Sequence, residues 1–287
     1  MENEHQYLSA LKEVYEDGQL RQTRNAKTIS LFGIKMKFDL QKCFPILTTK
    51  RVPFKTVLRE LLWFISGDTS NKTLIDKGVH IWTNNASKKF LSERGLNYSE
   101  GDLGPVYGFQ WRHIGAKYYS CDANYTNKGF DQLEDIIRRI KEDPTSRRLI
   151  LTAWNPLDLD KMALPPCHMT CQFYVRGEFL DCQLYQRSGD MFLGVPFNIS
   201  SYSMLIHIIA HCCSLKPGQL IHIIGDAHIY QEHIGVVEEQ LSRIPYICKA
   251  KFSIQPDAPK DIDSLKEIHC SLENYSSQDT LKAKMIA

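Results

Sequence analysis

Two strand-like segments joined by a tight turn place the strongest constraint on what this chain can fold into. Residues 169–175 and 179–186 have the strand-like character of β segments, and the intervening Arg176-Gly177-Glu178 is typical of a hairpin turn. Helix-like segments lie before and after this pair. Because some consecutive strands pair as hairpins while others are separated by helices, a regular βαβ alternation is excluded. The sequence therefore predicts an α+β fold in which helices flank one mixed sheet.

Helical periodicity marks the flanking elements. Val57, Leu58, Leu61, Leu62 and Ile65 form one apolar face, and a glycine ends the pattern. Further helices are expected over residues 5–17, 131–142, 198–213 and 231–242, and further strands over 148–153, 220–224 and 247–254. The chain has no internal repeat and no linker rich in Gly, Ser or Pro, so residues 1–287 are expected to form a single domain.

Charge and cysteine usage narrow the class of protein. The 35 basic and 33 acidic residues give a net charge of +2, which argues against bulk binding to nucleic acid or to a membrane, and RNA binding is not indicated. The N-terminus lacks an apolar secretory segment, and His207 and His211 interrupt the longest apolar run. We therefore expect a cytoplasmic protein, with the nucleus as an alternative compartment, and reduced thiols at its nine cysteines.

Cys167 is the first candidate nucleophile because it directly follows Pro165 and Pro166. The two prolines stiffen the backbone, and a rigid segment delivers the sulfur to one place. The competing interpretation is that Cys167 is one of nine cysteines and is simply buried, which is the commoner case for an arbitrary cysteine. The proline context alone leaves both interpretations open.

A second polar group, Gln186-Arg187-Ser188-Gly189-Asp190, stands at the end of an expected strand. An arginine, a hydroxyl and a glycine at a strand end can bind a phosphate, because arginine offers a fork of donors and glycine allows close backbone approach. The alternative is a polar surface loop. Two more basic clusters in a nearly neutral chain favour the phosphate site: Arg147 with Arg148, and Arg21 with Arg24 and Lys27.

Metal and nucleotide-cofactor chemistry lack their sequence signatures. Cys167 and Cys171 are four residues apart on an expected strand, a separation of about 13 Å that is too long for one zinc ion. His207 and His211 have helical spacing but stand in an apolar segment, which favours core histidines. Neither a GxGxxG turn nor a GxxxxGK[ST] loop is present, and no metal site is expected.

Together these residues resemble the thymidylate synthase family, in its eukaryotic-type, single-domain form. The matching segments are residues 44–51 (FPILTTKR), 60–64 (ELLWF), 101–112 (GDLGPVYGFQWR), 147–148 (RR), 163–168 (ALPPCH), 186–198 and 225–230 (GDAHIY). They follow one another in the family's order over nearly the whole chain. Residues 88–100 and 121–129 are similar to the insertions of eukaryotic-type members.

The resemblance implies the thymidylate synthase fold and the conversion of dUMP to dTMP. In this reaction 5,10-methylenetetrahydrofolate is consumed as one-carbon donor and reductant, and dihydrofolate is released. By similarity the Cys167 thiolate adds to C6 of uracil, and the positive charge of Arg187 favours that thiolate. Glu60 and Tyr107 correspond to residues that move protons. Asn198 corresponds to the residue that hydrogen-bonds the uracil amide edge, where related deoxycytidylate hydroxymethylases carry Asp.

The binding residues follow from the same resemblance. The implied dUMP set is Arg24, Arg147, Arg148, Arg187, Ser188, Gly189, Asp190, Asn198, His228 and Tyr230. The implied folate set is Asp190, Trp82, Asn85, Leu193, Gly194, Phe197, Ile286 and Ala287. In the family the residues equivalent to Arg147 and Arg148 reach the partner subunit's phosphate, so a sheet-to-sheet homodimer is implied. Neither a metal nor a nicotinamide is implied.

Two segments depart from the family pattern. Residues 24–28 (RNAKT) are one residue shorter than the usual Arg-Thr-Gly-Thr-Gly-Thr and lack both glycines. Alignment through residues 31–33 makes Arg24 the phosphate arginine, with Arg21 as the alternative. Residues 284–287 resemble the tail that closes over folate, but Ala287 is smaller than the usual last residue.

Two other functions compete with the dUMP reaction. One is hydroxymethylation of dCMP, and the other is a non-catalytic relative that binds RNA or a protein partner. The presence of Cys167, Glu60, Tyr107 and Asn198 favours an active enzyme, and the asparagine favours uracil.

Overall fold

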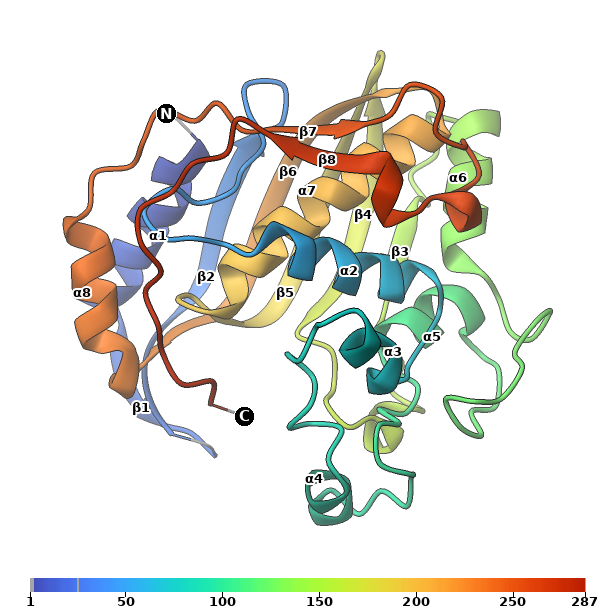
Figure 1. Cartoon of the computed structure of the whole chain (residues 1–287), viewed down its shortest axis with the longest axis horizontal. Helices are drawn as coiled ribbons and strands as arrows, with labels where there is room; N and C mark the ends of the chain where they lie inside the picture. The colour runs from blue at the N-terminus through green and yellow to red at the C-terminus, as the bar shows by residue number, and fades with distance from the viewer. Residues whose placement is uncertain (1–2, 25, 287) are drawn as a thin grey trace.

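The computed structural model describes residues 3–24 and 26–286, which build a six-stranded mixed sheet with helices packed on one of its faces (Figure 1). The strand order is β1 (Gln19–Gln22), β2 (Lys27–Asp39), β6 (Lys216–Tyr230), β5 (Phe179–Asp190), β4 (His168–Arg176) and β3 (Ile150–Thr152). Only β5 and β6 pair in parallel. The predicted α+β class with a mixed sheet is confirmed.

The expected hairpin is the antiparallel pair of β4 and β5. Arg176 faces Phe179 in the register, and Gly177 between them has φ 61°, a conformation that glycine adopts without strain. The turn therefore places the start of β4 beside the end of β5, since His168 faces Gln186. Cys167 and Arg187 stand directly beyond this pair, so the hairpin brings the two main candidate residues together.

The helices cover the inner face of the sheet. α1 (Asn3–Asp17) packs on β2, and the long apolar α7 (Gly194–Cys212) packs on β5, β6 and α2 (Phe54–Ile65). The other helices are α3 (Asn71–Asp76), α4 (Lys88–Glu93), α5 (Tyr107–His113), α6 (Gln132–Glu142) and α8 (Ile234–Ser242). The largest fully buried side chains include Trp63, Trp111, Phe38, Phe64 and Phe192.

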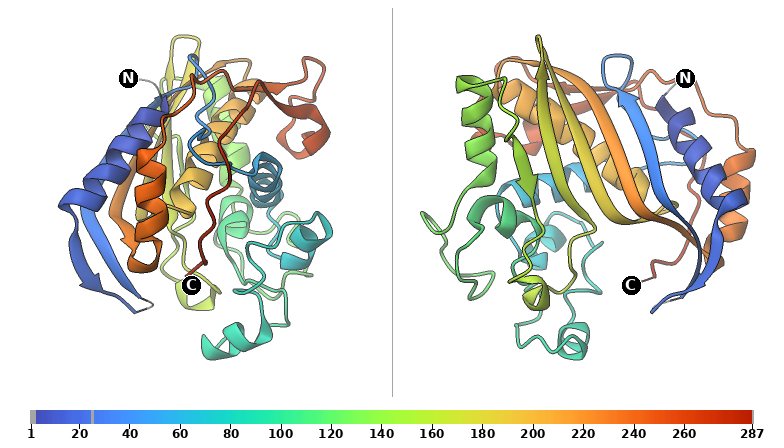
Figure 2. Two further views of the ribbon diagram at one scale, coloured as in Figure 1. Left: turned by 60° about the vertical axis from the view of Figure 1, so that its left-hand side comes forward. Right: turned by 180° about the vertical axis from the view of Figure 1, so that it is seen from behind.

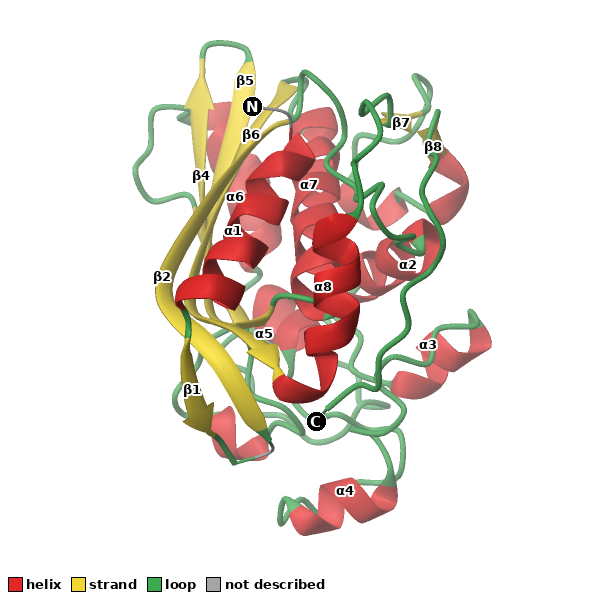
Figure 3. Ribbon diagram, turned by 90° about the vertical axis from the view of Figure 1, so that its left-hand side faces the viewer, coloured by secondary structure: helices red, strands yellow, loops and turns green. Residues whose placement is uncertain are grey.

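The outer face of the sheet carries no helix of the described residues, as the view from behind and the side view show (Figures 2 and 3). Ile150, Tyr174 and Tyr185 stand at outward positions of β3, β4 and β5 and are 46%, 62% and 38% exposed. We call the side of the sheet that bears these three residues the outer face. An uncovered face with large apolar side chains indicates an interaction surface.

Several elements differ from the sequence expectations. β1 and the 13-residue β2 were not predicted, although Ile34, Met36 and Phe38 point inward and alternate with exposed lysines. The strand expected over 247–254 covers only β7 (Lys251–Ile254), which pairs with β8 (Cys270–Glu273) in a separate two-stranded sheet. The short helices α3, α4 and α5 were also missed, because six or seven residues carry too little periodicity.

The expectation of reduced cysteines is wrong for two of the nine. Cys43 and Cys248 form a disulfide that joins the loop after β2 to the segment before β7. The two residues are 205 positions apart in the chain, and only the fold brings their Cα atoms within 6.1 Å. None of the helices in residues 3–24 and 26–286 has the length and apolar character needed to cross a membrane.

Candidate active site

Cys167 lies in the loop that enters β4, where Arg187 holds the segment in place. The Arg187 backbone N–H donates to the Cys167 carbonyl at 2.8 Å. Its guanidinium donates from Nε to the Pro166 carbonyl at 2.8 Å and from Nη2 to the Pro165 carbonyl at 3.0 Å. Nη2 also lies 3.8 Å from the Cys167 sulfur. The two prolines thus offer their carbonyls to one arginine, which fixes the sulfur beside a positive charge.

The protonation of this thiol differs from the sequence expectation. Burial raises the pKa of the Cys167 thiol, and the charge of Arg187 lowers it by a smaller amount. Arg187 therefore acts in the expected direction, but desolvation is the larger effect. In the isolated chain the thiol is protonated at neutral pH, and its activation needs a further positive charge or a proton acceptor.

Tyr107 supports the same segment from α5. The Cys167 backbone N–H donates to the Tyr107 hydroxyl at 2.7 Å, and this tyrosine is almost fully buried. Its ring stacks on His168, with centroids 4.1 Å apart and planes 17° apart. Burial raises the pKa of Tyr107 well above its ordinary value, so the hydroxyl stays protonated and can donate a hydrogen bond.

The Glu60 carboxyl on α2 is partly buried and interacts electrostatically with Tyr107. Burial raises its pKa to about 7, although the hydrogen bond from the indole N–H of Trp82, at 2.7 Å, works in the opposite direction. A carboxyl with a pKa near neutrality can both accept and release a proton, as acid–base catalysis requires. Trp82 and Asn85 lie in the turn before α4, and both are buried. The Asn85 Nδ2 atom has no hydrogen-bond partner within the described residues, so it suits a polar ligand.

The turn from β5 into α7 places Asn198 and the residues around it. The Asp190 carboxylate accepts hydrogen bonds from the backbone N–H groups of Phe192 (2.9 Å) and Leu193 (3.2 Å), which tightens the turn. Asn198 lies in the first turns of α7, and its Oδ1 accepts a hydrogen bond from Gln186 at 3.1 Å. The other expected residues of this turn are Ser188 and Gly189 on β5, and Leu193, Gly194 and Phe197 at the start of α7.

His228 and Tyr230 stand at the end of β6, beside β5. The rings are 5.1 Å apart, and His228 lies 3.3 Å from the Asp226 carboxylate. Burial raises the pKa of Tyr230 to about 12, the charges of Asp190 and Cys167 act in the same direction, and Arg24 opposes them. These electrostatic effects indicate that Tyr230, Asp190, Cys167 and Arg24 lie around one region.

The arginines divide into two groups. The Arg187 side chain donates to the Pro165 and Pro166 carbonyls beside Cys167, whereas Arg24 is exposed at the turn between β1 and β2. Arg21, the alternative to Arg24, is instead paired with Asp226 at 2.9 Å. Arg147 and Arg148 are exposed, and their side chains have no ion-pair partner in the described part of the chain. Ile150 faces Gln172, five residues or roughly 17 Å along β4 from Cys167, so these two arginines lie far from their own chain's thiol.

The C-terminal tail lies near His228 and Tyr230. The Lys284 carbonyl is 2.9 Å from Nε2 of the buried His233, whose ring is 5.4 Å from Tyr230. In Figure 1 this segment passes α8 and ends on the side of the molecule where α3 and α4 lie. Ile286 is half-buried, and Ala287 lies outside the described residues.

Lys50 lies against the turn between β5 and α7, and its residue type alone did not mark it as a candidate. Its side chain is buried, its Nζ donates to the Phe192 carbonyl, and Nζ lies 3.6 Å from the centre of the Phe192 ring. Burial lowers its pKa to about 7, against the opposing effect of Asp190. The only signal in the sequence was its position in the matching segment 44–51, because a lone lysine gives no indication of burial.

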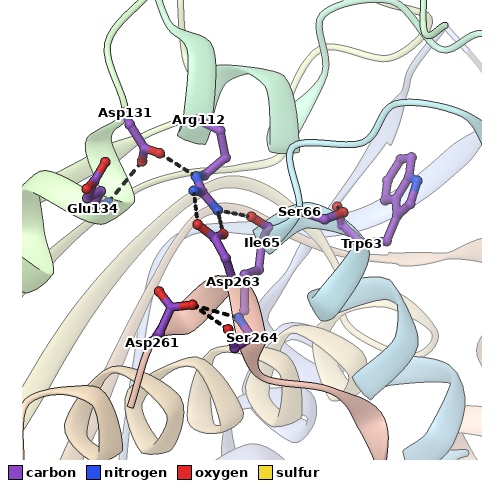
Figure 4. A network of polar contacts seen from close by, with 9 residues as sticks. All are labelled: Trp63, Ile65, Ser66, Arg112, Asp131, Glu134, Asp261, Asp263 and Ser264. Carbon is purple, nitrogen blue, oxygen red and sulfur yellow. Dashed lines mark hydrogen bonds and ion pairs between the residues drawn. The ribbon is translucent and has the colours of Figure 1, made fainter. Parts of the chain in front are cut away.

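Arg112 ties together the helices that carry Tyr107 and Glu60 (Figure 4). Arg112 lies in the last turn of α5, and its Nη1 donates to the Ile65 carbonyl at the end of α2 at 2.6 Å. It also pairs with Asp131 at 2.7 Å and with Asp263 at 2.6 Å. Its role is to hold the two helices in one arrangement. A polar pocket of about 470 Å³ borders Arg112 but contains none of the expected site residues.

A metal centre is not formed by the described residues. Within 3–24 and 26–286, no group of three or more His, Cys, Asp or Glu side chains is placed to hold a metal ion. Cys171 is buried within β4, and the ring of His207 packs against Phe44 and Phe252 in the core.

Comparisons with known proteins agree with this arrangement. The sequence profile of the thymidylate synthase family matches residues 5–287. The chain is 52% identical over 286 residues to a bifunctional dihydrofolate reductase-thymidylate synthase of Zea mays, covering 98% of this chain and 54% of that protein. It is 50% identical over 284 residues to the thymidylate synthase of equine herpesvirus 2, with 98% of each covered. A thymidylate synthase of Herpesvirus ateles is also 50% identical, over 286 residues, with 98% and 97% covered.

The chain thus spans about half the length of the bifunctional plant relatives and nearly the full length of the viral ones. The match runs through every segment that forms the site, from Glu60 to Tyr230. This chain belongs to the thymidylate synthase family.

Proposed function

We propose that this chain is an enzyme that converts dUMP to dTMP with 5,10-methylenetetrahydrofolate and releases dihydrofolate. The observation that carries the proposal is the environment of Cys167. One sulfur lies beside the Arg187 guanidinium, and its backbone is held by Tyr107, whose hydroxyl lies near a carboxyl with a pKa of about 7. A nucleophile, a cation and an acid–base pair in one place suit covalent catalysis on an electron-poor ring.

The chemistry begins when the Cys167 thiolate forms a bond to C6 of uracil. The electron pair of the C5–C6 double bond then moves toward the C4 carbonyl, and the Asn198 amide stabilises the resulting enolate through hydrogen bonds. This step makes C5 nucleophilic. After C5 has bonded to the folate methylene carbon, a base supported by Tyr107 and Glu60 takes the C5 proton, and the bond between that carbon and the folate nitrogen breaks. Transfer of a hydride from folate to the same carbon then expels the sulfur from C6. Folate supplies the carbon and the hydride that complete the methyl group.

The folate side of the site is proposed to include Trp82, Asn85, Asp190, Leu193, Gly194, Phe197, Ile286 and Ala287. Two observations support the fit. The buried Nδ2 of Asn85 needs an acceptor, and one oxygen of Asp190 is committed to the turn before α7, which leaves its other oxygen for a ligand. The aromatic rings of Trp82 and Phe197 suit a stacked pterin.

The phosphate side is proposed to need a second copy of the chain. Arg24 and Arg187 come from one subunit, and Arg147 and Arg148 reach in from the partner across the outer face of the sheet. The exposure of Ile150, Tyr174 and Tyr185 supports a sheet-to-sheet homodimer, since large apolar side chains on one face favour a partner. The same dimer would supply positive charge toward a thiol that burial alone keeps protonated.

The domain organisation, the location and the absence of a metal ion in the reaction stay predictions. We propose a single domain over residues 1–287, a cytoplasmic enzyme and a reaction without a metal ion.

The mechanism is tested by a covalent trap. Purified protein is mixed with 5-fluoro-dUMP and methylenetetrahydrofolate, and its intact mass is measured. Fluorine at C5 cannot leave as a proton, so we expect a ternary adduct in the wild-type protein and none in Cys167→Ser. The matched control is Cys213→Ser, a partly buried cysteine outside the site, which should form the adduct normally.

Three outcomes would count against the proposal. A wild-type protein without an adduct would favour a non-catalytic relative, and an adduct that persists in Cys167→Ser would assign the nucleophile elsewhere. Comparable turnover of dCMP and dUMP would support the hydroxymethylase alternative against the uracil assignment.

A further inference from the structure

A chain of hydrogen bonds runs through the sheet behind Asn198. The Gln186 side-chain amide donates from Nε2 to Asn198 Oδ1 at 3.1 Å and to the Ser188 carbonyl at 2.9 Å, while its Oε1 lies 2.8 Å from Nε2 of His222. Gln186 on β5 and His222 on β6 are both almost completely inaccessible to solvent.

The Ser188 carbonyl sets the direction of this chain. A backbone carbonyl can only accept a hydrogen bond, so the Gln186 amide must present its nitrogen to Ser188 and therefore its oxygen to His222. The second hydrogen on the same nitrogen then points at Asn198. Because the Gln186 nitrogen donates a hydrogen bond, the Asn198 amide must present its oxygen to Gln186. The Asn198 nitrogen therefore points away from Gln186.

His222 completes the chain at its buried end. Gln186 Oε1 is an acceptor, so the imidazole carries its proton on Nε2. Its Nδ1 is then a bare acceptor, in agreement with its lack of a partner within the described residues. Burial lowers the pKa of His222 to about 3, and the ring stays neutral. A neutral ring of this tautomer holds the Gln186 oxygen in place without bringing a charge under the site.

Gly189 provides the space that this arrangement needs. A Cβ atom there would lie 2.9 Å from Val195 Cγ2 and 3.2 Å from the Gln186 amide nitrogen. The nitrogen that donates to Ser188 and Asn198 would be pushed aside. The glycine of the strand end therefore accommodates the amide of Gln186 and leaves the phosphate role to its neighbours.

We propose that Gln186 and His222 are positioning residues that fix the polarity of the Asn198 amide and thereby make the site select a pyrimidine with a carbonyl at C4 over one with an amino group. The inference rests on the proposed function, because it takes the nucleotide base to lie against Asn198. Uracil offers an acceptor at O4 and a donor at N3, which match the Asn198 nitrogen and the free lone pair of its oxygen.

Cytosine offers the opposite pattern, a donor at N4 and an acceptor at N3. To match it, the Asn198 amide would have to turn over and present its nitrogen to the Gln186 nitrogen. Turning Gln186 as well would place its oxygen against the Ser188 carbonyl, which can only accept a hydrogen bond. Each arrangement leaves buried groups of like polarity facing each other, which costs roughly ten- to hundredfold in affinity.

The test is the ratio of the dissociation constants for dCMP and dUMP, measured by calorimetry on the full-length protein. Gln186→Glu keeps the shape but has at most one hydrogen, so it cannot donate to both Ser188 and Asn198. We expect its ratio to fall roughly tenfold or more toward unity. His222→Phe removes the donor to Gln186 and should lower the ratio by less, while His222→Gln, which restores an N–H donor, should recover part of it.

The matched control is His207→Phe. His207 is also a buried histidine, and its burial lowers its pKa to about 4. Its ring packs on Phe44 and Phe252 and takes no part in the hydrogen bonds that link His222, Gln186 and Asn198. Its substitution should change thermal stability and leave the ratio unaltered, so a change in stability alone cannot imitate the expected result.

The outcomes separate this inference from the proposed function. A wild-type protein that prefers dUMP, together with unchanged ratios in folded Gln186→Glu and His222→Phe, overturns the inference and leaves the proposed function intact. A wild-type protein that forms the 5-fluoro-dUMP adduct but binds dCMP equally well also overturns the inference alone. A wild-type protein that binds neither nucleotide overturns both.

Discussion

The two halves of the proposed active site differ in how completely one chain builds them. The base half, Glu60, Tyr107, Cys167 and Asn198, is buried or partly buried, and each of the four makes a hydrogen bond within the described part of the chain. The phosphate half, Arg24, Arg147, Arg148 and Arg187, is mostly exposed, and only Arg187 has side-chain contacts within the site.

Desolvation explains the difference. Carboxyl, hydroxyl and thiol groups can be buried in their neutral forms, and burial raises the pKa of Glu60, Tyr107 and Cys167 accordingly. Guanidinium groups stay charged, so several of them cannot be buried together without an anion. The base half can therefore form during folding, whereas the phosphate half requires a ligand and, in our proposal, a second chain.

Arg187 belongs to both halves, and its loss should have the largest effect. Arg187→Ala removes two hydrogen bonds to the Pro165–Pro166 carbonyls and the cation beside the Cys167 sulfur. We expect kcat/KM for dUMP to fall roughly a thousandfold, with kcat affected as well as KM. Arg187→Lys keeps the charge but not the fork, and should recover only part of the loss.

Steady-state kinetics over a range of dUMP concentrations measure this effect. Arg138→Ala, on the exposed side of α6, is the control for removing a paired surface arginine and should behave like the wild type. A change in KM alone, with kcat unaltered, would show that Arg187 serves phosphate binding and does not act on the base half.

Arg147 tests whether the phosphate half is shared between subunits. Arg147→Ala alone should lower kcat/KM roughly a hundredfold, by loss of a charge-assisted contact to the phosphate. Mixing Arg147→Ala with Cys167→Ser, followed by unfolding and refolding together, should restore about a quarter of the wild-type activity. Half of the dimers are then hybrids, and each hybrid has one intact site.

The assay is turnover of dUMP before and after the two variants are exchanged. Activity that stays at the level of the separate variants would contradict the shared site. Restored activity in a sample that remains monomeric by light scattering would contradict the dimer.

Glu60 tests the claim that burial is the main influence on the pKa values of the base half. Its pKa in the folded protein is raised to about 7, so the carboxyl supports folding while it is protonated, and that support is lost as the pH rises from about 4.5 through about 7. Glu60→Gln avoids this loss and can still accept the hydrogen bond from Trp82. We expect the variant to be more stable than the wild type by up to about 3 kcal/mol at pH 8, and the two to be similar near pH 4.5.

Urea unfolding at pH 5 and pH 8 provides the measurement, and activity should be lost in the variant at both values. A stability difference that does not change with pH would show that Glu60 titrates in the same range in the folded and unfolded chains. The base half would then be more open to water than its burial implies.

The site was predictable to the extent that residue type and family pattern indicate chemistry. Cys167 after two prolines, the Gln186–Asp190 segment and Asn198 were all recognised in advance, and the fold brings them together. Lys50 and His222 were missed, because nothing in their neighbouring residues indicates that they are buried. Arg24 and Arg21 were left as alternatives, and only the fold pairs Arg21 with Asp226.

The sequence by itself determined the α+β class, the β4–β5 hairpin, the amphipathic helices and the residue types available for chemistry at the site. These features depend on local spacing and on side-chain type. The tertiary structure alone decided the Cys43–Cys248 disulfide, the raised pKa of Glu60 and the polarity of the Asn198 amide. Each of these depends on the distance and the dielectric surroundings of groups far apart in the chain, such as Gln186 and His222, which are 36 residues apart and 2.8 Å from each other.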